Sequence, residues 1–159
     1  MWLFPAAYAV HILEEALGGE GFGRWIGHVI HREIGPKKFL IGNAVLWLAM
    51  VAAVGLLGQG SHAIWLAAAL GAVFTVNGAG HLVGTVVTRT YSPGLVSGVL
   101  LWVPLGLATL WWAWHSGSAA AWGAGILAGL AAQAALAVLA LALSNPVPAA
   151  PAPPHASMR

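Results

Sequence analysis

The chain has 159 residues, of which 60% are hydrophobic and only 6% carry a charged side chain. With a mean hydropathy of +0.84, this composition excludes an ordinary soluble domain and predicts an integral membrane protein. The net charge of +2 rests on six basic and four acidic residues, so nucleic acid is not an expected partner. The sequence has no Cys, which excludes disulfides and thiolate metal sites and leaves His and Glu as the metal ligands it offers.

The first apolar segment runs from Trp2 to about Leu17 and contains the sequence HILEE, which begins at His11. Because a full span needs about 20 residues, we expect a shorter N-terminal membrane helix here. On a helix, His11, Glu14 and Glu15 fall within about 100° of one another and share one face. Each Glu near the middle of a membrane helix costs on the order of 2.5–3.5 kcal/mol. This face therefore needs partners from elsewhere in the chain.

A cluster of Gly residues ends this segment, and the stretch 22–33 then shows apolar residues at helical spacing with basic residues on the other side. This pattern predicts an interfacial amphipathic helix that lies on the membrane. His28 and His31 lie three residues apart on its polar side, and we interpret them as solvated. Glu33 falls near the apolar side and can reach the site or fray with the helix end.

Four long apolar segments follow, at 39–57, 63–88, 95–114 and 119–143. Each is long enough to cross a bilayer, and the short joints between them predict that successive spans run antiparallel as neighbours. We predict an all-α polytopic membrane helix bundle with four full spans, the shorter N-terminal membrane helix and the interfacial helix. Residues 1–143 form this membrane domain, and residues 144–159, rich in Pro and Ala, are predicted to be a disordered tail.

Basic residues and Trp residues fall at opposite ends of the spans. By the positive-inside rule the basic ends face the cytoplasm, and the Trp ends form an aromatic belt on the other side. We therefore expect a multi-pass protein of the bacterial cytoplasmic membrane with its C-terminus inside. The basic group consists of Arg24, Arg32, Lys37, Lys38, Arg89 and Arg159; the Trp group consists of Trp2, Trp65, Trp111, Trp112, Trp114 and Trp122.

Polar residues of three different helices reach one depth in this arrangement. With a rise of about 1.5 Å per residue, His11 lies roughly 9 Å and His81 roughly 10 Å from the inner ends of their helices, and Asn43 is at a similar depth. Asn77 lies four residues before His81 and so shares its face. Gln133 is alone in the last span, near two Gly residues, and we interpret it as helix packing. The common depth predicts one intramembrane site.

The loop after the second long segment, 63–88, contains TYSPG, in which Pro93 and Gly94 suit the second and third positions of a type II turn. Tyr91 then lies at the rim of the site, beside Arg89. The three motifs HILEE, NGAGH and YSPG, in this order on a small multi-span protein, resemble the HXXEE family of integral membrane proteins. The resemblance covers most of the chain, from His11 to the last apolar segment. It implies a family of uncharacterised function that is suspected to be enzymatic, with no established substrate.

Two imidazoles and two carboxylates, from His11, Glu14, Glu15 and His81, suit one divalent metal: zinc, iron or manganese. Without a metal, the same residues can form a proton-transfer site, since two adjacent carboxylates in a low dielectric cannot both ionise cheaply. Both hypotheses describe a membrane enzyme that acts on a lipid or other apolar molecule from the bilayer. The predicted catalytic residues are His11, Glu14, Glu15, Asn77, His81 and Tyr91, with Asn43 orienting the centre. The alternatives are a small proton-coupled transporter and a polar network that only packs helices.

Overall fold

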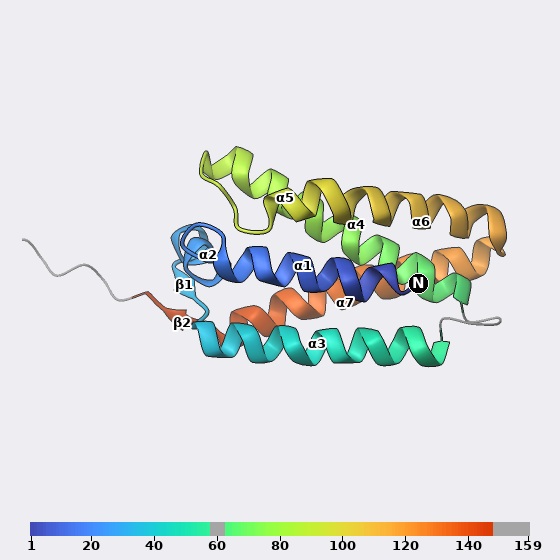
Figure 1. Ribbon diagram of the computed structural model, residues 1–159, viewed down its shortest axis with the longest axis horizontal. Helices are drawn as coiled ribbons and strands as arrows, with labels where there is room; N and C mark the ends of the chain where they lie inside the picture. The colour runs from blue at the N-terminus through green and yellow to red at the C-terminus, as the bar shows by residue number, and fades with distance from the viewer. Residues whose placement is uncertain (58–62, 148–159) are drawn as a thin grey trace, which may run out of the picture.

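The computed structural model describes residues 1–57 and 63–147, and they form a bundle of helices (Figure 1). The predicted all-α helix bundle is confirmed, with four segments long and apolar enough to cross a membrane. The predicted and observed ends of these segments agree within three residues. The largest difference is at the first segment, which begins at Pro36 rather than at Phe39. The helices are α1 (Leu3–Leu17), α2 (Phe22–Ile30), α3 (Pro36–Leu57), α4 (Ala63–Thr88), the run of α5 (Leu95–Ser97), η2 (Gly98–Trp102) and α6 (Val103–Ser116), and α7 (Ala119–Leu143).

The third span contains a π-helical turn, η2, between α5 and α6. Pro104 lies two residues after its end; proline has no N–H to donate, and its ring clashes with the carbonyl four residues earlier. Widening the turn relieves this conflict, and the N–H of Val103 donates to the oxygen of Gly98, five residues before it. The wider turn carries Trp102 into the centre of the molecule, where it is buried.

The central helix is α4, which packs along both α6 and α7. Glycines allow this close approach: a Cβ at Gly71 would lie 3.0 Å from the oxygen of Gly106, and one at Gly125 would lie 2.6 Å from the Cβ of Ala68. By contrast, α3 contacts α4 only slightly and packs mainly against α1. Each successive pair of spans is in contact, as predicted. Val54 on α3 joins Leu66 and Leu70 on α4 in one buried cluster, while α1 and a cavity lie beside the rest of α3.

An aromatic cluster fixes α1 against the bundle. Trp102 stacks on Phe74 with 3.9 Å between ring centroids, and Phe4 meets Phe74 edge to face at 4.8 Å. The indole N–H of Trp102 donates to the carbonyl of Ala7 over 3.1 Å. Because a short helix of 15 residues gains little stability by itself, these contacts are what hold α1 in register with α4.

The amphipathic helix ends at Ile30 rather than Glu33, because His31 adopts a left-handed conformation with φ of 56°. Residues Arg32–Glu33 (β1) then pair antiparallel with Asn145–Pro146 (β2). The apolar face of α2 forms part of the cavity wall, because Phe22 and Ile26 line the cavity.

The start of the predicted tail is ordered. The guanidinium of Arg32 donates to the hydroxyl and the carbonyl of Ser144, each over 2.9 Å. Val147 donates its N–H to the carbonyl of His31. The chain beyond Leu143 therefore remains attached to the bundle as far as Val147, and residues 148–159 of the predicted tail lie outside the described residues.

Candidate metal centre

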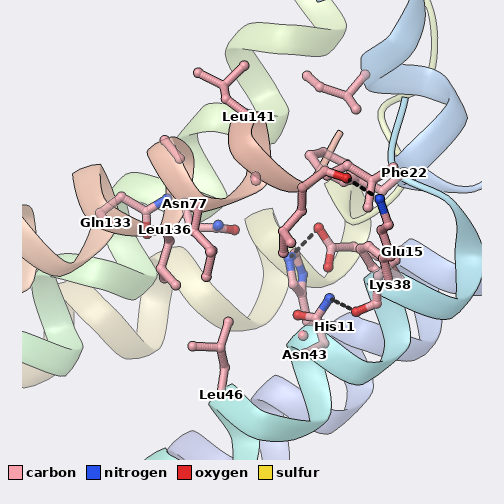
Figure 2. Close-up of a pocket in the computed structure, with 18 of the residues that line it drawn as sticks. His11, Glu15, Phe22, Lys38, Asn43, Leu46, Asn77, Gln133, Leu136 and Leu141 are labelled. Atoms are coloured by element: carbon pink, nitrogen blue, oxygen red, sulfur yellow. Dashed lines mark hydrogen bonds and ion pairs between the residues drawn. The ribbon is translucent and has the colours of Figure 1, made fainter. Parts of the chain in front are cut away.

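Two helices that are far apart in sequence bring three buried side chains together. His11 and Glu15 lie one turn apart on α1, and His81 faces them from α4. One carboxylate oxygen of Glu15 is 3.4 Å from Nε2 of His81 and 3.7 Å from Nε2 of His11. The three residues are 1%, 7% and 4% exposed, so water does not separate them from one another (Figure 2 labels His11 and Glu15).

The spacing of these atoms fits a single metal ion. All three ligand atoms lie within 4.8 Å of one another. Tetrahedral bonds of about 2.1 Å would place neighbouring ligand atoms roughly 3.4 Å apart, which is close to the two measured distances to Glu15. Nε2 of His11 is also a buried nitrogen without a hydrogen-bond partner among the described residues. The group can therefore hold a divalent ion with only small movements.

Two buried serines fix the orientation of the imidazoles. Nδ1 of His11 lies 2.8 Å from the hydroxyl of Ser97, and Nδ1 of His81 lies 3.0 Å from the hydroxyl of Ser92. When Nδ1 donates to a serine, Nε2 keeps its lone pair and points it at Glu15. This is the arrangement that supports a metal-ligating His. Sequence reasoning gave no role to either serine; Ser92 lies in the YSPG motif, whereas Ser97 follows it with no recognisable pattern.

The loop after α4 forms the turn that the sequence predicts. Leu95 donates its N–H to the oxygen of Ser92 over 2.9 Å, and Gly94 has φ of 100° and ψ of −5°, as the third position of a type II turn requires. A Cβ on Gly94 would lie 2.7 Å from Cε1 of His81 and 2.8 Å from Cε1 of His11. Gly94 is therefore required twice, for its backbone conformation and for the space that both imidazoles occupy.

Glu14 does not join the group that Glu15 forms. Its carboxylate accepts hydrogen bonds from the N–H groups of Val96 and Ser97, at 2.8 and 2.6 Å, and from the hydroxyl of Tyr91 at 2.6 Å. It thus caps the N-terminus of the span that begins at Leu95, where free N–H groups and the helix dipole favour an anion. Partial burial and the bond to Glu14 raise the pKa of Tyr91 to about 12, so this phenol remains a donor at neutral pH.

The other predicted residues take different places. Asn77 lines the cavity beside the centre, and its Oδ1 is buried without a hydrogen-bond partner among the described residues. Asn43 lines the same cavity but accepts a hydrogen bond of 2.8 Å from the hydroxyl of Tyr8, a residue that sequence reasoning missed. Arg89 lies exposed at the end of α4, in a left-handed conformation with φ of 56°.

The centre opens into a cavity of about 430 Å³ that is lined by residues of α1, α2, α3, α4 and α7 (Figure 2). This volume is in the range of small-molecule sites. Its walls are mostly apolar, with His11, Glu15, Asn77 and Gln133 among the few polar groups. The apolar lining includes Phe22, Ile26, Ile30, Leu46, Val73, Trp102, Leu136 and Leu139.

Comparison with curated proteins and with solved structures gives no match. A family model described as "Protein of unknown function with HXXEE motif" matches residues 2–109. That range includes the HILEE sequence from His11 to Glu15, the Asn77 and His81 face of α4, and the turn at Gly94. The match extends over more than half of the chain, and the chain therefore belongs to the HXXEE family.

Proposed function

We propose that the protein is a membrane enzyme that binds one divalent metal ion through His11, Glu15 and His81 and acts on an apolar molecule in the adjoining cavity. One observation carries this proposal: two imidazole Nε2 atoms and a carboxylate oxygen lie together, and two of these three residues, His11 and Glu15, line a mostly apolar cavity. Three protein ligands are typical of catalytic metal sites, because a further position stays open for water or substrate.

The donor set narrows the choice of metal. Two imidazoles and one carboxylate are found in zinc hydrolases and in the iron sites with two His and one carboxylate. The set that we expected from sequence had two carboxylates, and in the proposal Glu15 alone supplies the charge that offsets the ion. A bound ion would polarise a substrate oxygen or lower the pKa of a bound water.

The surrounding residues have separate roles in this proposal. Ser92 and Ser97 hold the imidazoles, as their hydrogen bonds to Nδ1 indicate. Asn77 lines the cavity beside the centre, where its amide can contact the bound molecule. Glu14 and Tyr91 hold the start of the third span, and so act on the geometry of Ser97 rather than on the substrate.

The cost of burial argues against a purely structural network. A buried carboxylate that only connects helices would have to gain its desolvation energy from interhelical hydrogen bonds, which average about 0.6 kcal/mol in membranes. Ionisable residues within membrane helices are therefore functional as a rule. A cavity of about 430 Å³ beside the group also favours a binding site over a filled core.

A second candidate keeps the same residues without a metal. Because one oxygen of Glu15 lies within 3.4 and 3.7 Å of two imidazoles, the three groups can share a proton and work as an acid–base pair. This candidate predicts that the purified protein binds no stoichiometric metal while its activity still requires all three residues.

We further propose that the substrate enters from the bilayer between α3 and α7. Both helices line the cavity, yet they contact each other little along their described lengths. Lys38 on α3 donates to the carbonyl of Leu143 on α7 over 3.0 Å, at the end where the positive-inside rule places the cytoplasm. This orientation also places the C-terminus inside.

Metal analysis of the purified protein tests the proposal. We expect about one zinc, iron or manganese ion per chain, and loss of most of it in Glu15→Gln and in His81→Ala. The matched control is the exposed pair of Glu20 and His28, whose side chains are 3.0 Å apart; Glu20→Gln and His28→Ala should retain the metal. Equal metal content in all variants, or none in the wild type, would contradict the ligand assignment.

A further inference from the structure

The last span carries one amide that the proposed metal centre does not use. Gln133 is the only side chain of α7 that bears an amide, hydroxyl or charge. It lines the same cavity as the centre, and its Oε1 is buried without a hydrogen-bond partner among residues 1–57 and 63–147. An amide in a membrane span is expected to find a partner in a neighbouring helix, because lipid offers none.

Gln133 and Asn77 lie side by side, as the register between α4 and α7 indicates. A Cβ at Gly125 would lie 2.6 Å from that of Ala68, and a Cβ at Gly129 would lie 3.0 Å from that of Ala72. Both pairs have an offset of 57 residues (125 − 68 and 129 − 72), so Gln133 is level with residue 76, next to Asn77. In Figure 2, the two labelled amides reach into the same part of the cavity from their two helices.

Both amides lack a hydrogen-bond partner for their carbonyl oxygen among the described residues. Both oxygens are buried, and no hydrogen bond joins the two side chains within that part of the chain. A buried amide that is left unpaired is costly, whereas one that binds a ligand is not. Because the amide group can be turned to present its oxygen or its NH₂, the pair offers both an acceptor and a donor.

The position of this pair sets its depth in the span. Asn77 lies four residues before His81 on α4 and shares its face. Asn77 is the fifteenth of the 26 residues of α4 (Ala63–Thr88), so the pair lies deep within the span. Lipid headgroups do not reach this depth, and a group bound here belongs to a molecule that is mostly within the hydrocarbon region.

We propose that Asn77 and Gln133 form a second polar subsite that binds a hydroxyl group of the substrate. The substrate is then an apolar alcohol with two polar functions: one at the His–Glu centre and a hydroxyl at the amide pair. A hydroxyl both donates and accepts a hydrogen bond, which matches the two amides better than a carbonyl or an ether does. This inference rests on the proposed function, because the first polar function is bound at the proposed metal centre.

Photoaffinity labelling of the full chain in lipid nanodiscs tests the subsite. The probes are a ten-carbon alcohol that carries a diazirine and a matched compound with a methyl group in place of the hydroxyl. In the wild type, we expect the alcohol to label cavity-lining peptides of α4 and α7 about fivefold more than the hydrocarbon does. Gln133→Met keeps the side-chain length without the amide and should abolish this preference.

The control variant on the same helix is Leu127→Met, which changes a side chain that is 70% exposed on the outer face of the bundle. It should label like the wild type. A second variant, Asn77→Leu, should also lose the preference for the alcohol. Equal labelling by both probes in the wild type, or an unchanged preference in Gln133→Met, would overturn the inference.

Metal content separates this inference from the proposed function. Gln133 is not among the three residues that would hold the metal, so Gln133→Met should bind as much metal as the wild type does. A wild type that lacks metal but prefers the alcohol would contradict the metal proposal and leave the hydroxyl subsite supported. A wild type that binds metal but shows no preference would contradict the subsite alone.

Discussion

The described part of the chain, residues 1–57 and 63–147, contains two His–Glu clusters that differ in burial and in the support they receive. The exposed pair, His28 and Glu20, is the closer one, with 3.0 Å between the imidazole nitrogen and the carboxylate oxygen, against 3.4 and 3.7 Å in the buried group. Yet the side chains of this pair are 74% and 40% exposed, so water and salt screen their attraction. Short distance alone is therefore a poor guide to function.

What distinguishes the buried group comes from distant parts of the chain. His11 and Glu15 gain a third partner from α4 and two serines from the loop and helix that follow it. The exposed pair has no such support among the described residues. Orientation by hydrogen bonds, together with a cavity, is what makes a cluster suitable for binding a ligand.

The largest difference between the two clusters should appear when the glycine beside each one is replaced. Gly94→Ala places a methyl group against both imidazoles and forces a non-glycine residue to φ of 100°. We expect a loss of about 2–5 kcal/mol in the free energy of unfolding, from backbone strain and overpacking, together with loss of bound metal. Thermal unfolding in detergent and metal analysis measure the two effects.

Gly21→Ala is the matched control near the exposed pair. Gly21 also has positive φ, 82°, but a Cβ there would meet its nearest neighbour at an ordinary distance of 3.5 Å. This variant should lose about 1–3 kcal/mol from strain alone and keep its metal. A Gly94→Ala protein that folds and binds metal normally would show that the imidazoles do not depend on this turn.

Removing the serines should have the next largest effect. Ser92→Ala and Ser97→Ala each free one imidazole to rotate, and loss of such support typically lowers metal affinity by about 10- to 100-fold. A competition titration with a chelator measures this change. Ser118→Ala, which removes a helix cap on the far side of the bundle, should leave metal affinity unchanged. If both serine variants also retain wild-type affinity, the imidazoles are held by something else.

Much of the fold followed from sequence because it depends on local pattern. The length and apolarity of each segment predict the spans, and the residues of YSPG predict the turn that Gly94 makes. The roles of Glu14 and Glu15 could not be separated, because both lie on the face that helical periodicity assigns to His11. Their difference is set by Ser97 and Val96, whose N–H groups reach Glu14 only after α5 has packed against α1.

The amphipathic pattern at 22–33 likewise identified a helix but not its partner. The same apolar face suits a membrane surface and a cavity wall, and only the packing of α3 and α7 around it decides in favour of the cavity. Ser97 and Tyr8 carried no signal, because one serine and one tyrosine in an apolar segment have no periodicity to interpret.

A substitution of Glu14 tests whether the two neighbouring carboxylates, Glu14 and Glu15, have different roles. Glu14→Gln weakens the cap on the span that begins at Leu95, and we expect a loss of about 0.5–2 kcal/mol in unfolding free energy. Its metal content should equal that of the wild type, unlike that of Glu15→Gln. Should Glu14→Gln lose metal as completely as Glu15→Gln does, Glu14 would be a ligand, as the sequence predicted.

The smallest effect should come from the exposed pair itself. Glu20→Gln removes one charge of an ion pair that water screens, and pairs of this kind contribute about 0–1 kcal/mol. Its unfolding temperature should change little and should not depend on metal. A shift larger than that of Glu14→Gln would mean that the exposed cluster supports the fold more than its exposure suggests.

X-ray absorption spectroscopy of the purified protein tests whether His11, Glu15 and His81 share one metal ion. We predict a first shell of nitrogen and oxygen at about 2.0–2.1 Å with scattering from two imidazoles, reduced to one imidazole or lost in His81→Ala. A shell of oxygen alone, or a spectrum that His81→Ala does not alter, would contradict the claim.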